Sequence, residues 1–220
     1  MIKYCRIFFI ISLSLATGLI ASCDSDTVDN GEKQMNILAD VTFYSSMPYA
    51  NETRGYWNGE SYTQFYQNTK PPFYMMVITR NDEGKEAIKE VVNVEGTVIE
   101  QIYQRNDSIY ILSSSLYFES PLFYVSNSYR TDEMQKDIYP IHILPKIIVK
   151  MKNDGDAAAI EEKYKDKLTY NPNNQKLLGV TIFDCHLGNS NEVLKLTEEI
   201  GKLEDVAWAE PDHSGGYFSY

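Results

Sequence analysis

The chain has 220 residues, 43% of them hydrophobic, which suits one large or two small globular domains. Its formal net charge is −11. A chain this acidic lacks the clustered Lys and Arg that neutralise phosphates, which argues against nucleic acid as a partner.

The N-terminus predicts an export signal. Lys3 and Arg6 make the start positive, and residues 7–21 form a mostly apolar stretch that is too short for a typical membrane span. The sequence Leu-Ile-Ala-Ser-Cys at 19–23 resembles the lipobox of bacterial lipoproteins. The resemblance implies cleavage before Cys23 and acyl chains on Cys23, which would anchor the protein to a membrane. A plain signal peptide with an incidental cysteine is the alternative.

The signal peptide is assigned to residues 1–22, and residues 23–34 predict a flexible tether because they are polar, acidic and without apolar period. Acidic residues directly after a lipidated cysteine resemble the surface-export signals of some Gram-negative phyla. We therefore expect a lipid-anchored protein of the outer membrane or cell surface, with a periplasm-facing orientation as the alternative.

The cysteines predict a fold without disulfide bonds. Cys5 lies in the signal and Cys23 would carry the lipid, so only Cys185 remains. Cys185 ends an apolar run, which favours a half-buried strand thiol over a nucleophile.

The first half of the exported chain, residues 35–140, predicts an antiparallel β module. It is rich in Tyr, Phe, Val and Ile and has closely spaced turn residues, notably at 81–84 and 105–108. The expected strands cover residues 35–44, 73–79, 88–94, 97–103, 109–112 and an aromatic stretch, 116–129, that is broken at Pro121.

One aromatic group in this module has two interpretations. Tyr56 and Trp57, with Gly55 and Gly59, could line a carbohydrate surface, since exposed aromatic rings stack on flat sugar faces. The same aromatics more often fill a β core.

The second half, residues 145–220, has a different pattern, in which predicted helices alternate with predicted strands. We expect a strand, helix, strand, strand, helix and strand, at residues 146–152, 156–165, 167–170, 177–185, 189–203 and 206–209. Asp156 and Asn189 would cap the helices, and Glu192 would complete a capping box with Asn189. This order is the split βαβ pattern of ferredoxin-like folds. We therefore expect an α+β protein whose C-terminal βαββαβ domain has both helices on one face of its sheet and the other face free.

The last expected strand carries a resemblance. The sequence Val-Ala-Trp-Ala-Glu-Pro-Asp-His at 206–213 resembles the last strand of subtilisin-family propeptides, including fervidolysin-like prodomains, and residues 147–152 resemble their first strand. In that family the open sheet face lies on two helices of the protease, and acids of the last strand cap those helices. The resemblance gives this role to Glu210 and Asp212, since a helix N-terminus favours a carboxylate. Alternatively, both acids are solvated turn residues.

In the same family the segment after the last strand enters the active-site cleft and adds a strand to the substrate-binding edges. The resemblance implies that Tyr220 occupies the first specificity pocket, with Phe218 and Tyr217 further along. This tail is longer than the family pattern, and Gly215 and Gly216 would cost affinity when they become ordered. A disordered aromatic end is the alternative.

No catalytic, metal or cofactor motif is present in the sequence. His142, His186 and His213 lack neighbours at metal-ligand spacing, and neither GxSxG nor a P-loop occurs. We therefore expect no catalytic residues, no metal and no cofactor, and a lipid-anchored envelope protein whose C-terminal domain binds a subtilisin-like serine protease as inhibitor or chaperone. The alternatives are a surface binding or scaffold lipoprotein that recognises glycan or peptide through the N-terminal β module, and the remnant of a longer protease.

Overall fold

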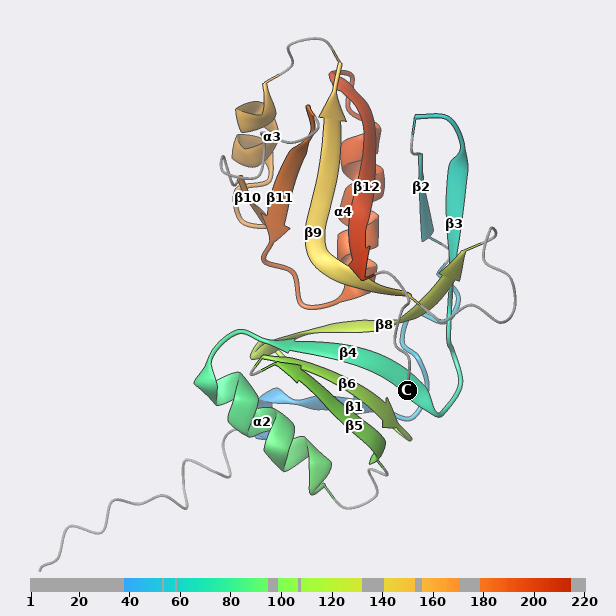
Figure 1. The fold of residues 1–220 in the computed structure, drawn as a ribbon, viewed down its shortest axis with the longest axis vertical. Coiled ribbons are helices and arrows are strands. Elements are labelled where there is room, and N and C mark those ends of the chain that lie inside the picture. The colour runs from blue at the N-terminus through green and yellow to red at the C-terminus, as the bar shows by residue number, and fades with distance from the viewer. Residues whose placement is uncertain are drawn as a thin grey trace, which may run out of the picture.

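The computed structural model describes residues 38–52, 54–57, 59–94, 99–106, 108–131, 141–152, 156–170 and 179–214. They form an α+β fold in which all the strand pairs are antiparallel, as the sequence predicts for both halves. Figure 1 shows a lower group of strands with helix α2, an upper sheet with α3 and α4, and a hairpin beside the upper sheet.

The described chain opens with a 3₁₀ turn, η1 (Leu38–Asp40), and strand β1 (Thr42–Tyr44). The expectation of a strand throughout residues 35–44 is wrong for η1, because the Val41 N–H donates to the Leu38 carbonyl (3.1 Å) and closes a helical turn. Strand β1 pairs with β7 (Tyr117–Glu119).

The lower sheet is built around β4 (Phe73–Thr79), which lies between β6 (Ile109–Ser114) and β8 (Phe123–Thr131). Strand β5 (Ile99–Asn106) pairs with the other edge of β6, which confirms the predicted hairpin. Its turn is held by the Asn106 side chain, which accepts hydrogen bonds from the N–H groups of Ser108 and Ile109.

Residues 82–92 form a helix, α2 (Asp82–Val92), where the sequence predicts a turn and a strand. That expectation is wrong for a local reason: the Asn81 side chain accepts a hydrogen bond from the Gly84 N–H (2.8 Å) and so caps a helix. Ala87, Ile88 and Val91 then recur at helical spacing and are buried in the lower core. This burial outweighs the strand preference of the β-branched residues.

Strands β2 (Arg54–Trp57) and β3 (Tyr62–Gln67) form a hairpin, and the end of β3 pairs with the end of β8. The hairpin stands beside the upper sheet, next to α4 and β12 (Figure 1).

The second half follows the predicted order of elements. It consists of β9 (Ile141–Met151), α3 (Ala157–Lys163), β10 (Leu168–Tyr170), β11 (Thr181–Cys185), α4 (Ser190–Gly201) and β12 (Val206–Ser214), and its sheet order is β10–β11–β9–β12. The two predicted caps are present: the side chain of Asp156 accepts from the Ala158 N–H (2.8 Å), and that of Asn189 from the Glu192 N–H (3.0 Å).

Strand β12 is longer than expected, since it continues beyond Ala209 to Ser214. It continues to pair with β9 across a register shift between Pro211 and His213, opposite the segment that contains Pro145. Proline offers no N–H to the ladder, which fits its place at this irregularity. Glu210 and Asp212, which follow the end of the predicted strand, therefore lie within β12.

The two halves share one of the two buried core clusters. Strand β8 pairs with β9 as well as with β4 and β3, with Ser128 opposite His142. Phe65, Tyr124 and Tyr129 of the first half belong to the same buried cluster as Val193 of α4. In the described part of the chain, no helix has the length and apolar character needed to cross a membrane.

His142 lies at this junction, and its burial predicts a sensitivity to acid. Burial lowers the pKa of His142 from 6.5 to about 4, so the folded protein holds the ring neutral where the unfolded chain protonates it. Stability is therefore fully present above pH 6.5 and is lost as the pH falls toward 4, by about 1.4 kcal/mol per pH unit. Urea unfolding across this range should show a smaller loss for His142→Gln than for the wild type. The exposed His186, changed to Gln, is the control, and equal pH dependence of the wild type and His142→Gln would contradict the assignment.

Candidate functional site

The upper sheet has one face covered by helices and one that they leave open. Phe183, Ile147, Val149 and Ala209 are buried in a cluster with residues of α3 and α4. The residues between them in sequence lie on the opposite face, because side chains alternate along a strand. No described helix or strand lies in front of β9, β11 and β12 in Figure 1, where α4 is behind the sheet.

The open face combines apolar and charged side chains. Ile148 lies opposite both Ile182 and Glu210, while Trp208 lies opposite Lys150. All five are partly exposed, so the described residues of the first half do not fully bury this face. On the two inner strands, Nζ of Lys146 and Oδ1 of Asp184 are 3.9 Å apart.

The two acids that the resemblance selects lie on β12. Glu210 is half-buried on the open face, and burial raises its pKa, with Asp212 also raising it and His213 lowering it. Asp212 is partly exposed at the register shift. The interpretation of both as turn residues after the strand is wrong, since β12 includes them.

The hairpin reaches the edge of the open face at Trp208. A Cβ on Gly59 would lie 2.8 Å from Cδ1 of Trp208, so the hairpin turn touches this ring closely enough to require a glycine. Gly59 also has a φ of +100°, in the region that favours glycine. Trp208 is therefore fixed in place by the first half of the chain.

The remaining predicted site residues, Cys23, Tyr217, Phe218 and Tyr220, lie outside the described residues. Cys185 is buried in β11, and burial raises the pKa of its thiol to about 12, which keeps it protonated at neutral pH. This agrees with a structural thiol better than with a nucleophile.

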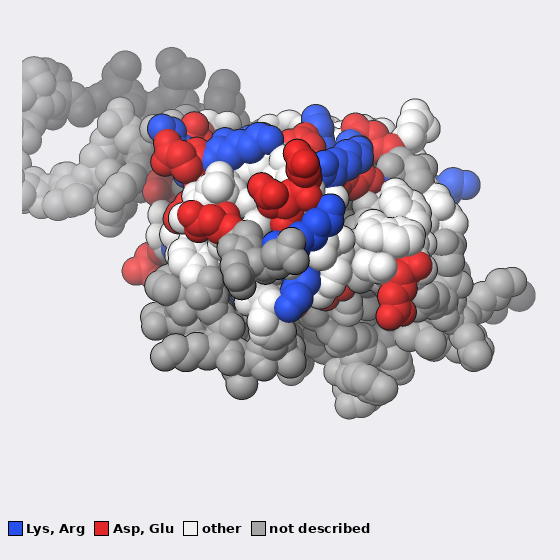
Figure 2. Space-filling model, turned by 90° about the horizontal axis from the view of Figure 1, so that it is seen from above, with Lys and Arg blue, Asp and Glu red and all other residues white. Residues whose placement is uncertain are grey.

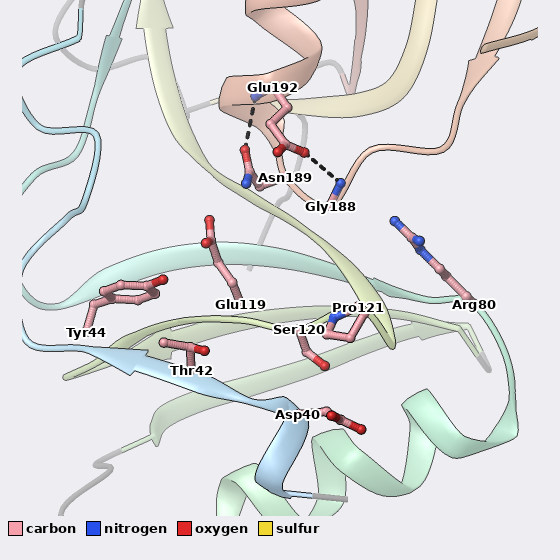
Figure 3. A pocket seen from close by; sticks show the side chains of 10 residues that line it. All are labelled: Asp40, Thr42, Tyr44, Arg80, Glu119, Ser120, Pro121, Gly188, Asn189 and Glu192. Carbon is pink, nitrogen blue, oxygen red and sulfur yellow. Dashed lines mark hydrogen bonds between the residues drawn. The ribbon is translucent and has the colours of Figure 1, made fainter. Parts of the chain in front are cut away.

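A pocket of about 380 Å³ lies between the two halves, where the start of α4 faces β1 and the end of β7 (Figure 3). It is lined by Asp40, Thr42, Tyr44, Arg80, Glu119, Ser120, Pro121, Gly188, Asn189 and Glu192. In Figure 3 the Glu119 side chain points toward Asn189, and Arg80 lies on the opposite side of the pocket from Tyr44.

Glu119 is the centre of a polar network in this pocket. Its carboxylate accepts hydrogen bonds from the hydroxyls of Tyr117 (3.1 Å) and Tyr49 (3.2 Å), and the Tyr49 oxygen accepts one from the Asn189 amide (3.2 Å). Burial raises the pKa of Glu119, the hydroxyls lower it, and the nearby Glu192 raises it. Because its hydrogen bonds come from tyrosines and reach the α4 cap, the network fastens the two halves together.

Neither this pocket nor its network was expected from the sequence. Glu119, Tyr49 and Asn189 are far apart along the chain, and no local pattern connects them. The Asn189 cap was the one available signal. Among the described residues, no group of three or more His, Cys, Asp and Glu side chains could hold a metal ion.

Comparison with known proteins finds no match: no family model, curated protein or solved structure resembles the chain significantly.

The Tyr49 hydroxyl should contribute measurably to stability. Tyr49→Phe removes the bridge between Glu119 and Asn189 and leaves a part-buried carboxylate with one fewer donor. We expect the free energy of unfolding to fall by about 1–2 kcal/mol in urea denaturation. The exposed Tyr74, changed to Phe, should alter it by less than about 0.5 kcal/mol. Equal effects of the two substitutions would show that the bridge contributes nothing.

Proposed function

We propose that β9, α3, β10, β11, α4 and β12 form a ferredoxin-like domain that binds a subtilisin-like serine protease as an inhibitor or folding chaperone. The protein itself is proposed to be non-catalytic. The observation that carries the proposal is an open, partly apolar sheet face with Glu210 on it.

The topology supports this proposal. The strand order β12–β9–β11–β10, with helices after the first and third strands of the unit, is the order that a split βαβ pair generates. Since α3 and α4 contribute Ile160 and Val193 to one buried cluster beneath the sheet, they leave the other face available for a partner.

The chemistry of the face supports docking against helices. Ile148, Ile182 and Trp208 provide apolar area, and Glu210 provides a carboxylate beside it. A helix N-terminus presents unpaired N–H groups and a partial positive charge, which stabilise a carboxylate by about 0.3–2 kcal/mol. Burial raises the pKa of Glu210, and docking on a helix N-terminus would oppose this rise, because the helix favours the ionised carboxylate.

Inhibition of a subtilisin-type protease by the exported chain tests the proposal. The whole chain is used, since its two halves share a core, with Cys23→Ser to prevent acylation. We expect loss of peptide hydrolysis, with inhibition weakened about two- to thirtyfold by Glu210→Ala.

Glu204→Ala is the matched control, since Glu204 is an exposed acid before β12. Undiminished hydrolysis by several subtilisin-type proteases at saturating protein would contradict the proposal. So would an equal effect of the two acid substitutions.

We further propose that acyl chains on Cys23 anchor the protein to the outer membrane or cell surface. Metabolic labelling with a radioactive fatty acid should mark the wild type and Cys185→Ser, while Cys23→Ser should lose the label and appear in the soluble fraction. Incorporation of label into Cys23→Ser would exclude this anchor.

A further inference from the structure

The solvent face of the β2–β3 hairpin carries a row of exposed aromatic rings. Trp57 lies opposite Tyr62, and Tyr66 is four residues further along β3, so the three side chains share one face. They are 48%, 57% and 49% exposed, respectively. On the other face of β3, Thr63 and Phe65 are buried.

The ring of Tyr62 is held flat against the hairpin. A Cβ on Gly55 would lie 2.6 Å from Cζ of Tyr62, so the ring covers the backbone at this glycine. Its hydroxyl is hydrogen-bonded to Glu198 of α4, which also accepts from the Gly55 N–H (3.0 Å) and lies 3.6 Å from the Arg54 guanidinium. One face of the ring is thus packed and the other is presented to solvent in a fixed orientation.

We propose that Trp57, Tyr62 and Tyr66 form a stacking platform for a neutral oligosaccharide. The C–H groups on a pyranose face pack on an aromatic face, and a preorganised ring loses little side-chain entropy on binding. This proposal does not rest on the protease-binding proposal, since the three rings lie on the hairpin and not on the open face of β9, β11 and β12.

The size of the platform matches an oligosaccharide better than a protein. Aromatic side chains bury about 150–250 Å² each, so three half-exposed rings offer about 300 Å². A stable protein partner needs about 800 Å² on each side. The distance along β3 from Tyr62 to Tyr66 is about 13 Å, which is the length of a short oligosaccharide.

The charge of the platform favours a neutral ligand. Between Tyr62 and Tyr66 on the same face lies Gln64, whose amide can exchange hydrogen bonds with sugar hydroxyls. The nearby Glu198 is paired with Arg54. Figure 2, which views the molecule from above, shows mainly uncharged side chains on the side where Figure 1 places the hairpin, with acidic side chains at the border of this area.

Affinity electrophoresis of the exported chain, with Cys23→Ser, tests this proposal. The probes are soluble β-glucan, xylan and galactomannan, with anionic alginate for comparison. We expect retardation by at least one neutral polysaccharide, and about tenfold weaker binding for Trp57→Ala, Tyr62→Ala and Tyr66→Ala. Tyr62→Phe retains the ring and its packing on Gly55 but loses the hydrogen bond to Glu198, so it should weaken binding by less than Tyr62→Ala does.

Tyr74→Ala is the control for loss of an exposed tyrosine elsewhere, since Tyr74 is 40% exposed on β4. Wild-type unfolding curves for the hairpin variants would show that they remain folded. Unretarded migration in all three neutral polysaccharides, retardation by alginate alone, or equal weakening by Tyr74→Ala and Tyr62→Ala would overturn the proposal.

Discussion

Strand β8 pairs with β4 in the lower sheet, with β3 in the hairpin and with β9 in the upper sheet. Its buried tyrosines reinforce this position: the Tyr124 hydroxyl donates to the Ile143 carbonyl (2.9 Å), and the Tyr129 hydroxyl lies 2.7 Å from that of Ser190. If β8 were displaced, these polar groups would stay buried without hydrogen-bond partners, which would cost about 1–3 kcal/mol of stability for each group. The relative placement of the two sheets, the hairpin and the pocket all depend on this strand.

The sequence predicts the second half well because its signals are local. The caps at Asp156 and Asn189 and the apolar stripe of α4 each lie within one helix, so no distant contact is needed to identify them. Helix α2 shows the limit of this reasoning. Its cap at Asn81 is equally local, but the β-branched residues of the helix favour a strand, and the cap decides for a helix only together with packing on the lower core.

The candidate sites divide in the same way. The resemblance of residues 206–213 to a propeptide strand selects Glu210, and Trp57 is an aromatic beside glycines in the sequence. The network at Glu119 cannot be predicted from the sequence, because it joins β7, the segment after β1 and the start of α4. The roles of Tyr62 and Tyr66 likewise depend on strand register and on Glu198 of α4, and sequence alone specifies neither.

The core shared by the two halves has a consequence for recognition. A small βαββαβ unit on its own buries little apolar surface and would be marginal in stability. Here Phe65, Tyr124 and Tyr129 add apolar area from outside that unit, and the turn at Gly59 supports Trp208. The sheet face proposed to bind a partner is thus held in place within the folded chain. If a partner binds this face, little of the chain has to become ordered. The free energy of the contacts then contributes to affinity and is not offset by the cost of folding.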